Sequence, residues 1–347
     1  MGLYLDSGYL NVEKLFNNKA ALVFCTGARG TGKTYGCLKH LLENKIPFIL
    51  MRRTQIQIDT IKNDDFSPFK PIEEDTGITT TIKSINKSIS AVYYATIDDT
   101  GKYVPEGQPI GYLIALSTIA NIRGFNLERV QVLLYDEFIG EAHESKIKLE
   151  GQAFKNAIET IGRNRELKGK PPLKVIALAN SNNLANPIYM EYELVATAEK
   201  MVAKGVEEVS LPERNIAVYH LMHSPISEMK KNTALYQSSG KNSEFYKMAI
   251  ENQYSANEMV NIKSVNLQHY NIVCVVGEAA VYKHKTNGTY YLTGHIKGTP
   301  KKIYDGSVDL KLFRRECFYL WLAYLRKKVF FESYIYQVLL EKYFNMI

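Results

Sequence analysis

Residues 27–34 read Gly27-Ala28-Arg29-Gly30-Thr31-Gly32-Lys33-Thr34 and match the pattern GxxxxGK[ST] in full. The stretch follows an apolar run with strand character and precedes a helical run over residues 34–43. In that context the backbone N–H groups and the positive end of the helix dipole can surround nucleotide phosphates. Lys33 would neutralise phosphate oxygens, and the Thr34 hydroxyl would hold Mg²⁺. We therefore predict a phosphate-binding loop made of all eight residues; a glycine-rich turn without a ligand is the competing interpretation.

A second pattern, roughly a hundred residues later, ends in two adjacent carboxylates. It reads Val132-Leu133-Leu134-Tyr135-Asp136-Glu137. This predicts a Walker B strand, in which Asp136 completes the Mg²⁺ shell and Glu137 orients and polarises the attacking water. Acidic pairs are common after strands, so the phosphate loop upstream is what favours the catalytic interpretation. The glutamate favours hydrolysis over phosphoryl transfer to a small acceptor.

A third pattern is an apolar strand that ends in side-chain amides, Leu178-Ala179-Asn180-Ser181-Asn182. If this strand lies next to the strand of the phosphate loop, its carboxyl end faces the nucleotide. Asn180 is then the candidate for sensing the γ-phosphate or holding the attacking water. The alternative is a turn, where asparagine is common for local reasons.

Several arginines are candidates for contact with phosphate. Arg163 ends an amphipathic helix and Arg123 lies in a loop before the acidic strand; in a ring of subunits either could reach the nucleotide of a neighbour, where a planar guanidinium matches phosphate oxygens. A basic residue at a helix C-terminus is also an ordinary partner of the helix dipole. Arg29 could touch the γ-phosphate in cis. For Arg52 and Arg53, at the end of the second strand, a solvated edge is favoured over contact with nucleotide or DNA.

Short apolar runs alternate with helical stretches over the first two thirds of the chain. Strands are expected at residues 21–25, 48–51, 132–135, 175–178 and 216–221, and helices at 34–43 and around 154–161. This alternation predicts an α/β fold with a parallel central sheet covered by helices on both faces. Residues 88–117, with a turn at 98–101, are expected to form an antiparallel hairpin at the periphery of the sheet.

The composition shifts after residue 222, which predicts three parts: a nucleotide-binding domain at 1–222, a helical connector at 223–256 and a smaller C-terminal domain at 257–347. Short strands, an Asn287-Gly288 hairpin turn and a helical tail with Trp321 make the last part α+β. The net charge of +7 allows a polyanionic partner without requiring one. No membrane segment, secretory signal or zinc-ligand spacing of cysteines is found, which favours the cytoplasm.

The segments GARGTGKT, FILMRR, LLYDEF, GRNRE and LANSNNLANP follow one another over roughly residues 20–190. With them the sequence resembles the short DNA-packaging ATPases of phi29-type tailed phages, relatives of the large terminases. The resemblance implies an additional-strand, catalytic-glutamate (ASCE) P-loop fold that uses ATP and Mg²⁺. It also implies a homopentameric ring that translocates double-stranded DNA into a procapsid through its portal, in the host cytoplasm, and leaves open a structural RNA between ring and portal. Arg163 would correspond to the family's basic finger from the neighbouring subunit, and Arg123 to a second trans-acting position that is usually lysine.

The same resemblance implies that the C-terminal domain is a degenerate RNase H-like nuclease. A working site would need several carboxylates around two metal ions about 4 Å apart. The strand at 271–276 carries no aspartate, and Asp305, Asp309 and Glu316 are not expected to converge. Lysines and arginines interleaved with aromatic residues favour instead a docking surface for nucleic acid or a capsid component, with a solvated face as the alternative.

Two other functions compete with the packaging motor. One is a terminase-like ATPase with an active nuclease. The other is a nucleotide-gated switch that binds nucleic acid with negligible turnover, which Glu137 argues against because a switch has little use for a carboxylate that polarises water.

Overall fold

The computed structural model describes residues 2–122, 124–141, 144–240, 246, 250 and 261–344. The described residues form two compact units. The first comprises Met1–Tyr192 with Met201–Ser255, and the second comprises Glu193–Lys200 with Ala256–Ile347. None of the described helices is both long and apolar enough to cross a membrane.

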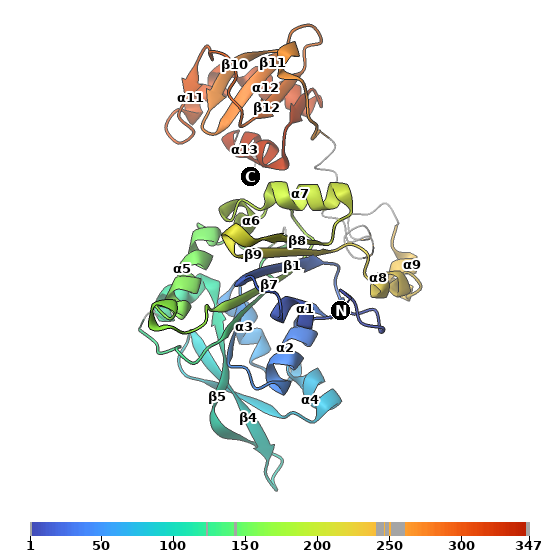
Figure 1. Cartoon of the computed structure of the whole chain (residues 1–347), viewed down its shortest axis with the longest axis vertical. Helices are drawn as coiled ribbons and strands as arrows, with labels where there is room; N and C mark the ends of the chain where they lie inside the picture. The colour runs from blue at the N-terminus through green and yellow to red at the C-terminus, as the bar shows by residue number, and fades with distance from the viewer. Residues whose placement is uncertain are drawn as a thin grey trace. The chain divides into compact units, whose positions relative to one another are not determined.

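The first unit is built around one large sheet (Figure 1). The sheet has nine strands in the order β3-β4-β5-β2-β6-β7-β1-β9-β8. The six strands from β5 to β9 in this order are parallel. The bounds are β1 Leu22–Gly27, β2 Phe48–Arg52, β3 Thr80–Ser84, β4 Ile89–Ile97, β5 Tyr103–Ala115, β6 Val132–Asp136, β7 Lys174–Asn180, β8 Glu208–Leu211 and β9 Ile216–Leu221. All five expected strands are present. β7 lies between β1 and β6, which is the additional strand of the predicted ASCE fold.

Helices cover both faces of this sheet, as predicted, because successive side chains of each buried strand point to opposite faces. On β1, Val23 and Cys25 pack in one core cluster with Leu38 of α2, whereas Phe24 contacts Tyr189 of α6 with ring centroids 5.9 Å apart. The helices of this unit are α1 Glu13–Phe16, α2 Lys33–Glu43, α3 Gln55–Ile61, α4 Lys70–Thr76, α5 Glu150–Gly162 and α6 Pro187–Glu191. A further helix, α7 Val195–Lys204, is divided between the two units.

The expected hairpin is formed by β4 and β5, which pair antiparallel up to Ile97 and Tyr103. The Asp98 carboxylate closes the turn by accepting hydrogen bonds from the backbone N–H groups of Thr100 and Lys102 at 2.9 and 3.0 Å. β5 continues into parallel pairing with β2, so the hairpin extends one edge of the main sheet (Figure 1). β3 then adds an outer antiparallel strand.

The predicted connector contains two short helices, α8 Pro225–Lys230 and α9 Ala234–Ser238. Most of its remainder lies outside the described residues.

The second unit is a mixed five-stranded sheet with helices, in the order β13-β10-β11-β12-β14. The expected turn at Asn287-Gly288 joins β11 and β12, which pair antiparallel through Lys283 and Tyr290. Trp321 stacks on Phe344 with ring centroids 5.3 Å apart. The bounds are β10 Tyr270–Val276, β11 Ala279–His284, β12 Tyr290–Thr293, β13 Ile303–Tyr304, β14 Val329–Phe331, α11 Leu310–Glu316, α12 Phe318–Leu325 and α13 Tyr334–Tyr343. The α+β content agrees with the expectation, while the RNase H likeness stays a prediction.

Candidate nucleotide-binding site

The eight-residue loop connects β1 to α2 at the carboxyl edge of the parallel sheet. It borders a cavity of about 460 Å³. The carboxyl ends of β6 and β7 reach the same cavity because parallel strands all end at one edge. Most of the predicted site is thus brought together, and the lining residues are Arg29, Gly30, Thr31, Gly32, Lys33, Thr34, Tyr35, Asp136, Glu137, Glu141, Ala179 and Asn180.

Two glycines give the loop its shape. Gly30 and Gly32 have φ values of +67° and +84°, in the left-handed region that side chains with a Cβ rarely adopt. Gly32 directly precedes α2 as its N-cap residue. The first turn of α2 carries no acidic residue, so the positive end of its dipole is left for an anion.

Lys33 lies buried beneath the loop, with an exposed fraction of 7%. Its ammonium group donates hydrogen bonds to the carbonyl oxygens of Ala28 at 2.7 Å and Gly27 at 3.3 Å. Burial lowers the pKa of Lys33 to about 8, against the opposing effect of Asp136 and other nearby groups. The ammonium group also donates to the Thr31 hydroxyl oxygen at 3.2 Å. An ammonium group held by these neutral acceptors can exchange them for phosphate oxygens.

The two predicted Mg²⁺ ligands are adjacent. The Thr34 hydroxyl donates to Asp136 Oδ1 at 2.9 Å, and Asp136 is only 2% exposed. Burial raises the pKa of Asp136, as does the neighbouring Glu137, while Arg52 opposes the shift. Hydroxyl and carboxylate oxygens suit Mg²⁺, which usually takes one or two carboxylates together with substrate phosphates. No cluster of three or more His, Cys, Asp or Glu side chains able to hold a metal occurs in the described part of the chain.

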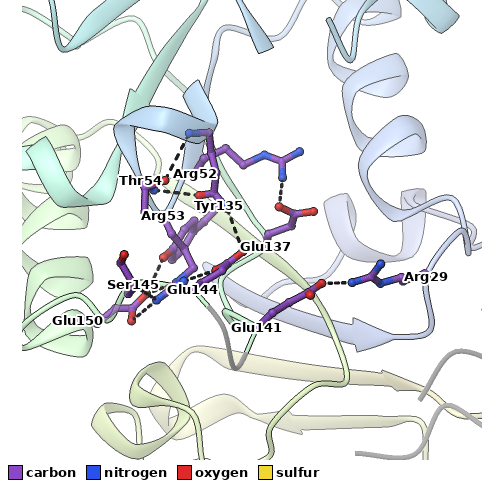
Figure 2. A network of polar contacts seen from close by, with 11 residues as sticks. Arg29, Arg52, Arg53, Thr54, Tyr135, Glu137, Glu141, Glu144, Ser145 and Glu150 are labelled. Atoms are coloured by element: carbon purple, nitrogen blue, oxygen red, sulfur yellow. Dashed lines mark hydrogen bonds and ion pairs between the residues drawn. The ribbon is translucent and has the colours of Figure 1, made fainter. Parts of the chain in front are cut away.

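Arg52 is not on a solvated edge, and that expectation is wrong. Its guanidinium pairs with Asp136 Oδ2 at 2.8 Å and with the carboxylate of Glu137; Figure 2 shows the second contact. Burial would lower the pKa of Arg52, but the two carboxylates outweigh it and the pKa is raised. The signal that could have found this pair is strand order, because β2 lies beside β6 with Met51 opposite Tyr135.

Arg53 is also buried, which corrects the second half of the same expectation. It is 4% exposed and points away from the cavity into a cluster of acidic side chains (Figure 2). Its Nε and Nη2 atoms donate to the two carboxylate oxygens of Glu150 at 2.7 and 3.0 Å, and Nη1 pairs with Glu144. Burial opposes its charge, but Glu150 more than compensates and the pKa is raised. Arg53 thus ties the end of β2 to the segment after β6.

Glu137 faces the cavity from the residue after β6. Its φ of +58° is left-handed, and 46% of its side chain is exposed. Arg29, proposed to reach the γ-phosphate, lies across the cavity in an ion pair with Glu141 (Figure 2). Both predicted residues therefore line the site, and both hold partners that they could exchange for ligand.

Asn180 is the last residue of β7 and stands in register with Gly27, the first residue of the phosphate loop. It lines the cavity. This position is the one expected for a residue near the γ-phosphate, and its role stays a prediction.

Arg163 lies away from the cavity. Its guanidinium is exposed and donates to the carbonyl oxygen of Phe125, while Arg165 donates to that of Val130 at 2.7 Å. Both carbonyls precede β6, whereas Asp136 ends it. Arg163 is thus at the amino edge of the sheet, opposite the phosphate loop. Arg123 lies outside the described residues.

The chain is similar in sequence to packaging proteins of Bacillus phages. The chain is 25% identical to the DNA packaging protein of Bacillus phage phi29 over 199 residues, 55% of this chain and 52% of that protein. It is 27% identical to the DNA packaging protein of Bacillus phage B103 over 186 residues, 52% of this chain and 50% of that protein. The matches thus span about half the length of these relatives.

Solved structures show the same fold. The bacteriophage Phi-29 viral genome packaging motor assembly contains a chain with a TM-score of 0.67 and 18% identity, covering 99% of both chains. The Phi-28 gp11 DNA packaging motor gives a TM-score of 0.59 and 16% identity, covering 96% of both. The family model described as Podovirus DNA encapsidation protein (Gp16) matches residues 5–305. With a phosphate loop, an acidic strand end and a match over most of its length, the chain belongs to the podovirus DNA encapsidation protein (Gp16) family.

Proposed function

We propose that this protein is an ATP-driven motor that moves double-stranded DNA into a preformed procapsid, using Mg²⁺-dependent ATP hydrolysis in a homomeric ring. The observation that carries the proposal is the convergence of Lys33, the Thr34–Asp136 pair and Glu137 on one cavity at the carboxyl edge of the sheet. Family membership supplies the link from hydrolysis to DNA packaging.

The chemistry follows from the groups around the cavity. Thr34 and Asp136 would hold Mg²⁺, which neutralises charge on the β- and γ-phosphates. Lys33 would turn from the loop carbonyls to the phosphates. Glu137 would leave Arg52 and accept a hydrogen bond from the attacking water, with Asn180 close enough to the γ-phosphate to orient it.

The ring belongs to the same proposal. Arg163 and Arg123 would act on the nucleotide of a neighbouring subunit, in a pentamer attached transiently to the portal of the procapsid in the host cytoplasm. The packaging function of the curated relatives and the packaging motors among the solved structures support this assembly. A structural RNA between ring and portal remains compatible with it.

The second unit would supply a docking surface. Lys283, Lys285 and Lys301 line a cavity of about 650 Å³ together with Tyr290 and Tyr319. Ammonium groups beside aromatic rings suit a nucleic-acid backbone and its bases, and such binding weakens steeply with salt.

A direct test compares ATP hydrolysis with and without double-stranded DNA over a range of protein concentrations. Glu137→Gln should keep nucleotide binding and lose roughly 10²-fold or more in turnover, the range for removing a general base. Hydrolysis by this variant at the wild-type rate would refute the assignment of Glu137.

A nuclease is the competing activity, and two of the carboxylates considered for it already have partners. The Asp305 carboxylate accepts from the backbone N–H groups of Ser307 and Val308 at 2.7 and 3.0 Å. Glu316 accepts from the Tyr304 hydroxyl at 2.7 Å and pairs with Lys302. We expect supercoiled plasmid to stay intact with the protein and Mn²⁺, on an agarose gel that would reveal nicking.

A further inference from the structure

Two carbonyl groups of the phosphate loop are held from outside by distant segments. A loop that directs N–H groups at phosphates turns carbonyls outward, and these need partners of their own. The backbone N–H of Leu10 donates to the Thr31 carbonyl at 3.0 Å. The ammonium group of Lys230, from α8 of the connector, donates to the Arg29 carbonyl.

Lys230 is closely fitted to the loop. A Cβ atom added at Gly30 would collide with the Lys230 ammonium group. Lys230 is half-buried, yet it does not line the nucleotide cavity. The lysine therefore contacts the loop without being one of the residues that line the site where phosphates would bind.

The helix that carries Lys230 is anchored in the same unit. Ile226 and Ser227 of α8 are buried. A Cβ atom at Gly8 would lie 3.1 Å from both Pro225 and Ile226, so the start of α8 packs tightly against the N-terminal turn. The Lys230 ammonium group thus comes from a helix that is packed in place beside the loop.

We propose that Lys230 is a positioning residue of the nucleotide site. The Arg29–Gly30 peptide is planar and trans, so its carbonyl and N–H point in opposite directions. Lys230 holds the carbonyl outward, which turns the Gly30 N–H toward the cavity and the phosphates. The inference rests on the proposed nucleotide binding and adds a consequence: since docking of α8 and phosphate binding share one peptide, each stabilises the other.

Lys231 provides a matched control. It has the same charge and follows Lys230 directly, but its ammonium group pairs with Glu228 of the same helix at 2.6 Å. Replacing it changes the charge of the connector equally without touching the Arg29 carbonyl.

The experiment uses the full chain and the variants Lys230→Met, Lys230→Arg and Lys231→Met. Binding of a fluorescent ADP analogue and steady-state ATP hydrolysis are measured for each. Lys230→Met should raise the Kd for ADP and the KM for ATP about tenfold, as for the loss of one charged hydrogen bond, with a much smaller change in kcat. Lys230→Arg should restore most of the affinity because it keeps a donor, and Lys231→Met should match the wild type.

A second readout separates positioning from general stability. ADP should slow amide hydrogen exchange in residues 225–230 of the wild type and leave it unchanged in Lys230→Met. If Lys230→Met does not fold, Lys230→Gln takes its place. Because glutamine keeps a neutral donor, its affinity for ADP should lie between that of the wild type and that expected for Lys230→Met. Wild-type affinity in a folded Lys230→Met or Lys230→Gln overturns the proposal. A wild-type protein that binds no nucleotide would instead refute the proposed function.

Discussion

The buried position of Lys33 disfavours the charged form of its side chain. The side chain is 7% exposed and its partners include the carbonyls of Gly27 and Ala28. Carbonyl dipoles compensate less for lost hydration than an ionised partner does. Burial therefore lowers the pKa of Lys33 to about 8. Nucleotide phosphates would supply the missing negative charge and raise this pKa again.

We expect nucleotide binding to take up protons near pH 8. Close to its pKa about half of the Lys33 population is neutral, and phosphate binding favours the charged form. Affinity for ADP should accordingly fall as the pH rises above about 8. Calorimetric titrations at pH 8 in two buffers of different ionisation enthalpy measure the uptake.

Lys39, a partly exposed lysine of α2 that pairs with Glu43, gives the control. Lys39→Arg should leave the uptake unchanged, whereas any residual binding by Lys33→Arg should proceed without uptake because a guanidinium stays charged. Equal enthalpies in both buffers for the wild type would contradict this account of Lys33.

Two arginines at the end of β2 form ion pairs with acidic residues at the end of β6 and at the start of α5. Arg52 and Arg53 follow one another and point to opposite faces, as neighbouring strand residues do. Arg52 pairs with the two carboxylates at the end of β6. Arg53 pairs with Glu144 and Glu150, at the entry to α5. Together they link β2, β6 and α5 by charge as well as by packing.

Arg53→Met should destabilise the first unit strongly. Glu150 is only 4% exposed, and the substitution removes the guanidinium partner of its carboxylate. Breaking a buried ion pair typically costs about 3–5 kcal/mol. The free energy of unfolding by urea measures the loss. Lys155→Met, which removes an exposed pair with Glu191, should change it by less than about 1 kcal/mol. A similar small loss for Arg53→Met would show that the acidic cluster does not depend on this arginine.

The surroundings of β2 show what the sequence can and cannot predict. The phosphate loop and the five buried strands, the acidic strand among them, were predictable because each depends on a local pattern of residues. The partners of Arg52 and Arg53 depend on β2 lying beside β6, and no local pattern contains that order. The contact of Lys230 with the phosphate loop was not predictable for a similar reason, because it joins residues about 200 positions apart.

The position of Arg163 determines how it could act in hydrolysis. It follows α5 and contacts residues that precede β6. The phosphate loop lies at the other edge of the sheet, beyond the seven residues of β7, a length of roughly 20 Å at the rise of a strand. A guanidinium side chain cannot span that distance within its own subunit. Any role in hydrolysis therefore requires a neighbour.

Mixing two inactive variants tests this role. Arg163→Ala keeps Glu137, and Glu137→Gln keeps Arg163, so each alone should lack one half of every active site. An arginine finger contributes roughly 10³ to 10⁵ in rate because it meets charge that develops in the transition state. In mixed rings some interfaces would join an intact glutamate to an intact arginine, and ATP hydrolysis should reappear with a maximum at intermediate ratios.

The mixture needs proof of assembly and a control at the same surface. Differently tagged variants that copurify establish that mixed rings form. Arg165 contacts the nearby Val130 carbonyl in a similar way. If the loss of activity in Arg163→Ala is not caused by local unfolding, Arg165→Ala should be active by itself. Mixed rings that form yet stay inactive at every ratio would leave Arg163 a structural residue, holding the loop at Phe125 in place.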